Sequence, residues 1–269
     1  MSISKIVTPE NMDEALELVS NGGLLMSGGQ ALLPEIRQRN HRNSINLIDI
    51  SNLTELNSVI DVKNNILSIG ARVTISELIE NQNILNHAKL LVEAGQRLGD
   101  TQIRNSATLG GNLCWGEPRA NLLVALIAAS TTVEFIDNSM KIQKVSLQTL
   151  FEQKISRGIK DFILLSAEIC LKNITNSSYQ EFSRQQNDLA IISLAIIEQS
   201  ELISGCVGGL FESPFKFERI EKSEIEKEVM LLAKKAKMTK MDNQFATFGH
   251  RLSILESILN KTVKAHRLI

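Results

Sequence analysis

Two glycine pairs constrain the fold of this chain more than any other feature of its sequence. Gly28-Gly29 follow a short apolar segment, and Gly110-Gly111 precede a longer one. Neighbouring residues without Cβ atoms let successive N–H groups point at phosphate oxygens, although a lone pair after a strand is more often a simple turn. Neither pair fits the GxGxxG or GxxxxGKS/T pattern, so the pairs do not indicate a Rossmann or P-loop fold.

The first 51 residues predict a small α/β unit whose strands are buried on both sides. Thr8 can cap a helix whose first position suits Pro9, and apolar residues at helical spacing continue to Val19. Gly22-Gly23 would end this helix. The rest of the unit is expected to be a strand over 24–26, a helix over 31–38 and a strand over 45–51.

Residues 52–171 have a mixture of strand and helix patterns. An alternating pattern over 59–71, broken at Lys63-Asn64-Asn65, predicts a β-hairpin. Thr74 and Glu77 have the spacing of a capping box at the start of a helix. The remaining elements are expected to be helices over 88–98 and 120–129 and strands over 132–136 and 161–171.

The polar stretch 173–178 indicates a turn or a domain boundary. Beyond it we expect a β segment over 189–197, which is also compatible with a helix, a strand over 202–207, and helices over 223–237 and 248–259. The predicted fold class is α+β. The chain is expected to have one domain over 1–171, with subdomains over about 1–51 and 52–171. A C-terminal domain over 172–269 would contain a small antiparallel sheet with helices.

Charge and aromatic content argue against nucleic acid as a partner. The chain has 29 basic and 30 acidic residues, one Trp and one Tyr, and therefore offers neither a basic stripe nor a base-stacking surface. The longest apolar run, 122–129, is too short to span a bilayer, and the first residues have no apolar signal core. These features predict a soluble, cytoplasmic protein.

Cysteine and histidine give no pattern of metal ligands. Cys114, Cys170 and Cys206 form no CxxC pair, and the four histidines show no ligand spacing. We therefore expect no iron–sulfur cluster, no zinc site and no other metal site in this chain. No catalytic triad is visible either, so no catalytic residue is predicted.

Longer motifs surround both glycine pairs and continue beyond them. They are SGGQALLPEIRQR (27–39), DTQIRNSATLGGNLCWGEPRANLLVALIA (100–128), EFSRQQNDLAIISLAI (181–196) and VGGLFESP (207–214). In this order they resemble AGGQSLLPxxxxR, PQIRNxGTIGGNLAxASPxADLxxALLAL, KFSRRxxDxxxVSVAV and GGVAPTP. These are motifs of the FAD-binding medium subunits of molybdenum hydroxylases, the family of the carbon monoxide and xanthine dehydrogenase flavoprotein subunits. The resemblance covers nearly the whole chain.

This resemblance implies a vanillyl-alcohol-oxidase-type (PCMH) FAD-binding domain of two α/β subdomains plus the C-terminal α+β domain, with FAD extended between them. Residues 27–31 and 108–112 would wrap the pyrophosphate, Leu164 would pack near the flavin, and Leu98, Gly99 and Ala107 would line the adenine side. The implied cofactor-binding residues are Leu25, Ser27, Gly28, Gly29, Gln30, Ala31, Leu32, Leu98, Ala107, Thr108, Gly110, Gly111, Asn112, Asn121, Leu164 and Gln180.

Three positions depart from the family's motifs. Asn121 stands where the family has an Asp that contacts ribityl or ribose hydroxyls, and Glu181 and Gln185 stand where it has Lys and Arg. Asparagine still accepts a hydrogen bond, but a carboxylate in place of a lysine disfavours an anionic cofactor. A site shifted by one residue would use Gln180 instead. An assembly subunit that has lost its flavin is the alternative that these departures leave open.

By the same resemblance, the chain is an oxidoreductase subunit that does not act on a substrate alone. It would take electrons from a 2Fe–2S small subunit, beside a molybdopterin-binding large subunit, in a dimer of heterotrimers. The acceptor would be NAD or another electron acceptor. A stand-alone flavin oxidoreductase is the competing class, but it would need a longer substrate domain than the residues after Leu171 provide.

Overall fold

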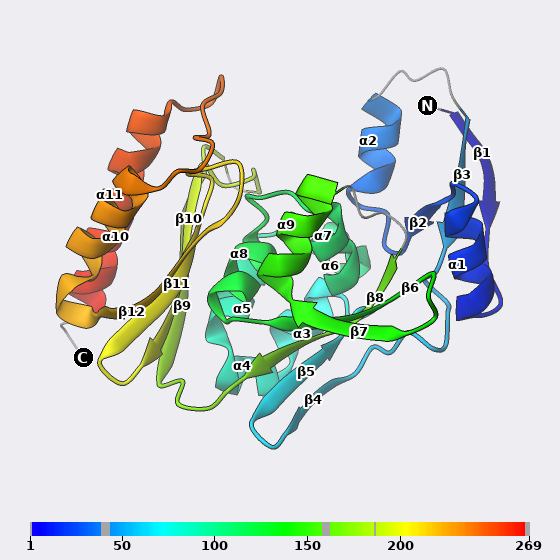
Figure 1. The fold of residues 1–269 in the computed structure, drawn as a ribbon, viewed down its shortest axis with the longest axis horizontal. Helices are drawn as coiled ribbons and strands as arrows, with labels where there is room; N and C mark the ends of the chain where they lie inside the picture. The colour runs from blue at the N-terminus through cyan, green and yellow to red at the C-terminus, as the bar shows by residue number, and fades with distance from the viewer. Residues whose placement is uncertain (1, 39–43, 158–161, 186, 267–269) are drawn as a thin grey trace. The chain divides into compact units, whose positions relative to one another are not determined.

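The computed structural model describes residues 2–38, 44–157, 162–185 and 187–266 (Figure 1). Its contacts divide the chain into two compact units. Residues 1–78, 100–116 and 132–169 make up the first unit. Residues 79–99, 117–131 and 170–269 make up the second, so two segments from the first half of the sequence pack with the C-terminal part.

A parallel sheet of three strands lies at the start of the first unit, in the order β1-β3-β2. Parallel neighbours need crossover connections, which two helices provide. The elements are β1 (Ser2–Val7), α1 (Met12–Ser20), β2 (Leu24–Met26), α2 (Leu32–Gln38) and β3 (Ser44–Asp49). The predicted α1, β2, α2 and β3 are therefore confirmed, whereas β1 was not predicted.

The start of α1 corrects one expectation from the sequence. The helix begins at Met12, and its N-cap is Asn11, whose side chain accepts a hydrogen bond from the Glu14 N–H at 2.9 Å. Thr8 and Pro9 precede the helix and do not cap it. Asn and Thr are both good caps, and Asn11 prevails because it lies directly before the buried stripe that begins at Met12.

The first unit also contains a sheet of five strands in the order β4-β5-β8-β6-β7. Its strands are β4 (Ile60–Lys63), β5 (Ile66–Gly70), β6 (Thr132–Asp137), β7 (Ile142–Ser146) and β8 (Phe162–Cys170). Helices of this unit are α3 (Ile75–Glu80), which runs across the boundary between the units, α6 (Thr101–Ser106), α7 (Leu109–Trp115) and α9 (Leu147–Arg157).

The predicted hairpin and capping box are both present in this part of the unit. Asn64 and Asn65 have φ angles of 51° and 60°, which two-residue hairpin turns between β4 and β5 require. Thr74 Oγ1 accepts from the Glu77 N–H at 3.2 Å, and Glu77 Oε2 accepts from the Thr74 N–H at 2.8 Å. These local signals were correctly interpreted because each needs only its own neighbours in the sequence.

The second unit is built on an antiparallel sheet of four strands in the order β12-β11-β10-β9. The strands are β9 (Asn176–Phe182), β10 (Ile192–Gln199), β11 (Leu202–Gly208) and β12 (Phe215–Glu221). Helices α4 (Gln82–His87), α5 (Lys89–Gln96), α8 (Asn121–Ala128), α10 (Ile225–Lys235) and α11 (Phe248–His266) and the 3-10 turn η1 (Lys222–Glu224) complete it.

Helices cover both faces of this sheet, with α5 and α8 on one side and α10 and α11 on the other (Figure 1). Every residue of α8 is buried, as expected for a helix that is apolar all round.

The segment 189–197, whose sequence is compatible with both a strand and a helix, forms strand β10 from Ile192 onward. The turn expected over 173–178 is wrong from Asn176 onward, because β9 starts there and pairs with β10. No helix in the described ranges is long and apolar enough to cross a membrane.

Candidate functional site: two glycine loops in the first unit

The first glycine pair lies in a loop, residues 27–31, that connects β2 to α2. Gly29 has a φ of +67°, a conformation that favours glycine. A Cβ on Gly28 would lie 1.8 Å from the Ser106 carbonyl oxygen, so no larger residue fits there. The carbonyls of Gly29 and Ala31 accept from Leu33 and Glu35 at 3.0 and 3.3 Å and thereby start α2.

The N–H groups of this loop are a notable feature of the unit. Those of Gly28, Gly29, Gln30 and Ala31 meet no acceptor in the part of the chain that the structure describes. Gln30 and Ala31 are exposed, whereas both glycines are half-buried. Consecutive backbone N–H groups without acceptors form an anion-binding concavity, so this loop can bind a phosphate group.

The second glycine pair lies inside α7, a helix that was not predicted, and the expected apolar helix α8 follows it. Thr108 caps α7 and accepts from the Gly111 N–H at 3.1 Å. The N–H groups of Leu109, Gly110 and Asn112 donate to the carbonyls of Val73, Ala71 and Thr108, each at 2.9 Å. These backbone donors are therefore already used inside the protein, unlike those of residues 28–31.

The two glycines of this second pair have different surroundings. A Cβ on Gly110 would lie 3.0 Å from Ala71, which shows that this glycine permits close packing. A Cβ on Gly111 would meet only Thr108 Oγ1, at 3.0 Å, and Gly111 is exposed. Asn112 Oδ1 is buried and has no hydrogen-bond partner among the described residues. The exposed glycine leaves a surface that a ligand can approach closely, and the buried oxygen is an acceptor whose donor is missing from the described residues.

Direct contacts join the first glycine loop to the start of α7. Thr108 Oγ1 donates to Ser27 Oγ at 3.3 Å, and Gly28 packs on the backbone of Ser106 and Ala107. The structure thus brings together most of the residues predicted from the sequence. The members of this group are Leu25 and Leu32 at the ends of the first loop, Ser27, Gly28, Gly29, Gln30, Ala31, Ala107, Thr108, Gly110, Gly111 and Asn112.

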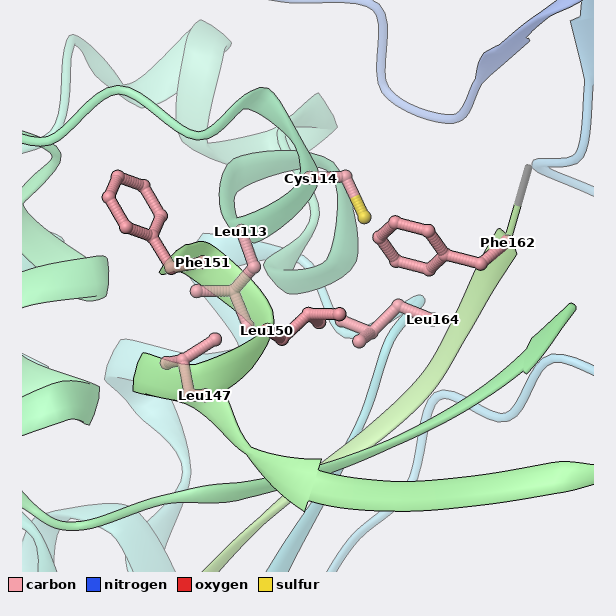
Figure 2. Close-up of a pocket in the computed structure, with 7 residues that line it drawn as sticks. All are labelled: Leu113, Cys114, Leu147, Leu150, Phe151, Phe162 and Leu164. Carbon is pink, nitrogen blue, oxygen red and sulfur yellow. The ribbon is translucent and has the colours of Figure 1, made fainter. Parts of the chain in front are cut away.

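Leu164 lies close to the C-terminal half of α7. It lines a small apolar pocket with Leu113 and Cys114 of that helix, as Figure 2 shows. The remaining lining residues are Leu147, Leu150, Phe151 and Phe162. The pocket offers apolar packing but no polar side chain apart from the Cys114 thiol.

Within the described ranges, the structure shows no group of three or more His, Cys, Asp or Glu side chains that could hold a metal ion.

Leu98, Asn121 and Gln180 belong to the second unit. Leu98 and Gly99, whose φ is +50°, follow α5. Asn121 opens α8, is 5% exposed, and donates to Glu181 Oε2 at 3.0 Å and to the Ala94 carbonyl at 3.5 Å. Gln180 lies on the opposite face of β9 from Glu181, because successive strand residues alternate between faces. The structure therefore does not bring Asn121 and Gln180 together.

Sequence reasoning missed a polar cluster formed by Asn121, Tyr179 and Glu181. The Tyr179 hydroxyl donates to Glu181 Oε2 at 2.9 Å, beside the bond from Asn121. Burial raises the pKa of the Glu181 carboxyl above its usual range, against the opposing effects of Tyr179 and Arg97. Burial also raises the pKa of Tyr179 well above its usual value, and the charge of Glu181 adds to this. Tyr179 and Glu181 lie two residues apart, and residues at this spacing share one face of a strand. The spacing could therefore have indicated the cluster only if strand β9 had been predicted.

The first unit fits the diphosphate of a dinucleotide cofactor such as FAD. Four successive N–H groups have no acceptor among the described residues, glycines allow close approach, and no lysine or arginine occurs in 27–31 or 106–112. Backbone donors can stabilise a phosphate without the cost of desolvating a charged side chain.

Comparison with known proteins agrees with this geometry. Residues 2–169 match the family described as the FAD binding domain in molybdopterin dehydrogenase. The glyceraldehyde dehydrogenase medium chain of Sulfolobus acidocaldarius is 26% identical over 231 residues, covering 83% of this chain and 81% of that protein. The nicotine 6-hydroxylase medium subunit of Paenarthrobacter nicotinovorans is 21% identical, covering 96% and 95%.

Solved structures share the fold over almost the full length. A chain of quinoline 2-oxidoreductase from Pseudomonas putida 86 superposes with a TM-score of 0.83 at 19% identity, covering 98% of this chain and 96% of that one. A chain of the carbon monoxide dehydrogenase from Hydrogenophaga pseudoflava also gives 0.83, at 17% identity, covering 97% and 96%. With the family match over residues 2–169, the chain belongs to the FAD-binding domain family of the molybdopterin dehydrogenases.

Proposed function

We propose that this chain is the FAD-carrying, electron-transferring subunit of a multi-subunit molybdenum-containing dehydrogenase. The observation that carries the proposal is the row of N–H groups from Gly28 to Ala31 without acceptors, next to the exposed Gly111. When bound, FAD supplies an isoalloxazine that accepts electrons singly or in pairs. The chain's own residues bind and orient this cofactor, and none of them needs to act as a nucleophile or base.

Each part of the first unit has a role in this proposal. The N–H groups of 28–31 donate to the diphosphate, Gly111 permits its approach, and Asn112 Oδ1 accepts a hydrogen bond from the ligand. Gly110 and Thr108 hold the start of α7 in place rather than donate to the phosphate. Leu25, Leu32, Ala107 and Leu164 supply apolar surface, and Leu98, Asn121 and Gln180 remain contacts predicted from the sequence.

The finer description of the fold is part of the same proposal. The domain over 1–171 is of the vanillyl-alcohol-oxidase (PCMH) type, and the C-terminal domain spans 172–269. The family match ends at residue 169, close to this boundary, which supports it. The cytoplasm is the proposed location.

The names of relatives support an assembly with other subunits. Similar proteins include a subunit alpha of a 6-hydroxypseudooxynicotine dehydrogenase complex and a subunit beta of caffeine dehydrogenase. The partners proposed for this chain are a molybdopterin-binding large subunit and a 2Fe–2S small subunit, arranged as a dimer of heterotrimers. The electron acceptor is NAD or another small acceptor.

Isolation of the tagged chain from the cells that naturally make it tests this function. We expect a complex with molybdenum, iron and FAD in fixed ratios, whose flavin absorbance bleaches when the substrate of the large subunit is added anaerobically. The separated chain should keep its flavin but show no bleaching with the same substrate. A chain that is isolated without molybdenum and iron, or that oxidises the substrate alone, would contradict the proposal and favour a stand-alone flavin oxidoreductase.

A further inference from the structure

The solvent side of helix α10 carries two adjacent leucines. Leu231 and Leu232 are 40% and 41% exposed. The opposite side of the helix packs against β12 and α11 of the same unit (Figure 1). That side is formed by the buried residues Ile225, Val229, Met230 and Ala233. Because these four residues already anchor the helix, the two leucines are not needed for its packing, and they leave apolar surface in water.

One charged residue lies at each end of this leucine pair. Glu228, Leu231, Leu232 and Lys235 are spaced at i, i+3, i+4 and i+7, so they form one continuous stripe, which we call the α10 stripe. Opposite charges three or four residues apart stabilise a solvated helix, and the positions at that spacing between Glu228 and Lys235 are 231 and 232. Both positions hold leucine. The stripe therefore separates its two charges instead of pairing them within the helix.

The charged ends of the stripe have no salt bridge of their own. Within the ranges that the structure describes, Glu228 and Lys235 form no ion pair. Glu228 acts through space on Lys227, but the ammonium group of Lys227 binds Glu224 Oε2 at 3.1 Å. Lys235 is exposed and Glu228 is half-buried. Both charged groups can therefore meet a partner molecule.

The stripe is complementary to itself. Its order along the chain is Glu-Leu-Leu-Lys, and the reverse order is Lys-Leu-Leu-Glu. Two antiparallel copies related by a two-fold axis therefore place Glu228 of each copy opposite Lys235 of the other, with the leucines between them. In such a dimer a contact from residue i to residue j is matched by one from j to i, so one stripe gives two equal ion pairs and one apolar centre.

Other occupants fit the stripe less well. An anionic membrane or a nucleic acid presents negative charge over its whole surface, which attracts Lys235 and repels Glu228. A second copy supplies both complementary charges and the apolar centre from the sequence of this chain itself.

We propose that the α10 stripe is a contact surface for a second copy of this chain, with two α10 helices packed antiparallel about a two-fold axis. The 11 residues of the helix extend about 16 Å, which is short for an interface when stable complexes bury roughly 1,600 Å². The dimer therefore dissociates reversibly, and its population rises with protein concentration. This inference goes beyond the proposed function and does not depend on FAD.

The test is sedimentation velocity of the purified full-length chain over a range of concentrations, which measures the dissociation constant of the dimer. Glu228→Lys and Lys235→Glu should each raise this constant about tenfold or more, because both ion pairs become repulsions. The variant with both changes should return it to within about threefold of the parent, because the two charges exchange places. Lys172→Glu is the matched control, since Lys172 is exposed and lies in the turn before β9. It should leave the dissociation constant unchanged.

Mixing the two single variants distinguishes a second copy from any other partner. An equimolar mixture of Glu228→Lys and Lys235→Glu chains should form a mixed dimer about as tight as the parent, because each contact again joins opposite charges. Leu231→Ala should weaken the dimer about tenfold without lowering the melting temperature, since alanine favours a helix and the lost contact lies between copies. This variant decides the question if a charge variant does not fold.

A chain that is monomeric at every concentration would overturn the inference. A dissociation constant for Glu228→Lys within about twofold of the parent, or a double variant that dimerises no better than the single ones, would overturn it as well. A monomer that binds phosphatidylglycerol vesicles, and loses this binding in Lys235→Glu, would identify an anionic membrane as the occupant instead. FAD retention after desalting is measured in the same samples. A parent that dimerises without retaining FAD contradicts the proposed function alone, and a monomer that retains FAD contradicts this inference alone.

Discussion

At the residue scale, the atoms around each glycine Cα show whether that glycine is needed for close packing or leaves room for a ligand. Gly28 is closed off by the Ser106 carbonyl, whereas Gly111 faces open space except for Thr108 Oγ1. The sequence predicted that both pairs matter. It could not assign them different tasks, because the atoms that close off Gly28 come from a segment far along the chain.

Gly111→Asp should abolish FAD retention and leave the fold largely intact. The new carboxylate would lie where an anionic cofactor approaches, and an unpaired like charge at a ligand surface is strongly unfavourable. Gly249→Asp is the matched control, since Gly249 lies in the first turn of α11, where nothing lies within 4 Å of an added Cβ. Flavin absorbance after desalting measures both variants. Equal flavin content in the two would show that Gly111 does not face the cofactor.

The raised pKa of Glu181 predicts how pH affects stability. The folded chain binds this proton more tightly than the unfolded chain, so the contribution of Glu181 to stability is greatest below the unfolded pKa of about 4.5. It decreases as the pH rises from there through the higher folded pKa. Glu181→Gln removes this dependence. The free energy of unfolding of the variant, minus that of the parent, should therefore be more positive at pH 7 than at pH 4 in urea titrations. A difference that is constant over this range would contradict the raised pKa.

At the element scale, local patterns were predicted and pairings between distant segments were not. The hairpin at Asn64-Asn65 and the capping box at Thr74 depend on neighbouring residues and were predicted correctly. Strand β9 was not predicted, because the polar residues of 173–178 suggested a turn, while its pairing with β10 and its packing against α5 fix it as a strand. The contact between Asn121 and Glu181 was missed for the same reason, since it joins α8 to β9.

Helix α11 depends on one buried cation. Arg251 is fully buried, and its guanidinium donates to the carbonyls of Ile191, Gly209 and Ala246 at 2.6, 2.9 and 3.2 Å. It also donates to Asn243 Oδ1 at 2.9 Å. Burial lowers the pKa of Arg251, although a guanidinium with these acceptors stays charged. Arg251 thus links the helix to three separate loops of its unit.

Arg251→Met should lower the free energy of unfolding by about 3–5 kcal/mol, because several buried acceptors lose their donor together. Lys261→Met, an exposed position on the same helix, should change it by less than about 0.5 kcal/mol. Urea unfolding followed by circular dichroism measures both. Similar losses in the two variants would show that the hydrogen bonds of Arg251 contribute little.

At the scale of the whole molecule, the sequence predicted the fold class and the family, because several long motifs occur in a fixed order along nearly the whole chain. The family match confirms the family, and the shared fold confirms the α+β class. The sequence did not predict that residues 79–99 and 117–131 pack with the C-terminal part, since these segments flank residues 100–116, which belong to the first unit. Such packing depends on tertiary contacts that periodicity along the chain does not reveal.

We propose that the open N–H groups of residues 28–31 hold the diphosphate of FAD. The most direct test is reconstitution of the purified chain with FAD and, separately, with FMN, followed by desalting and an absorbance spectrum. We expect about one FAD per chain, released intact by denaturation and therefore not covalently attached, and much weaker retention of FMN, which lacks the diphosphate. A chain that retains no FAD, or that retains FMN equally well, would contradict it.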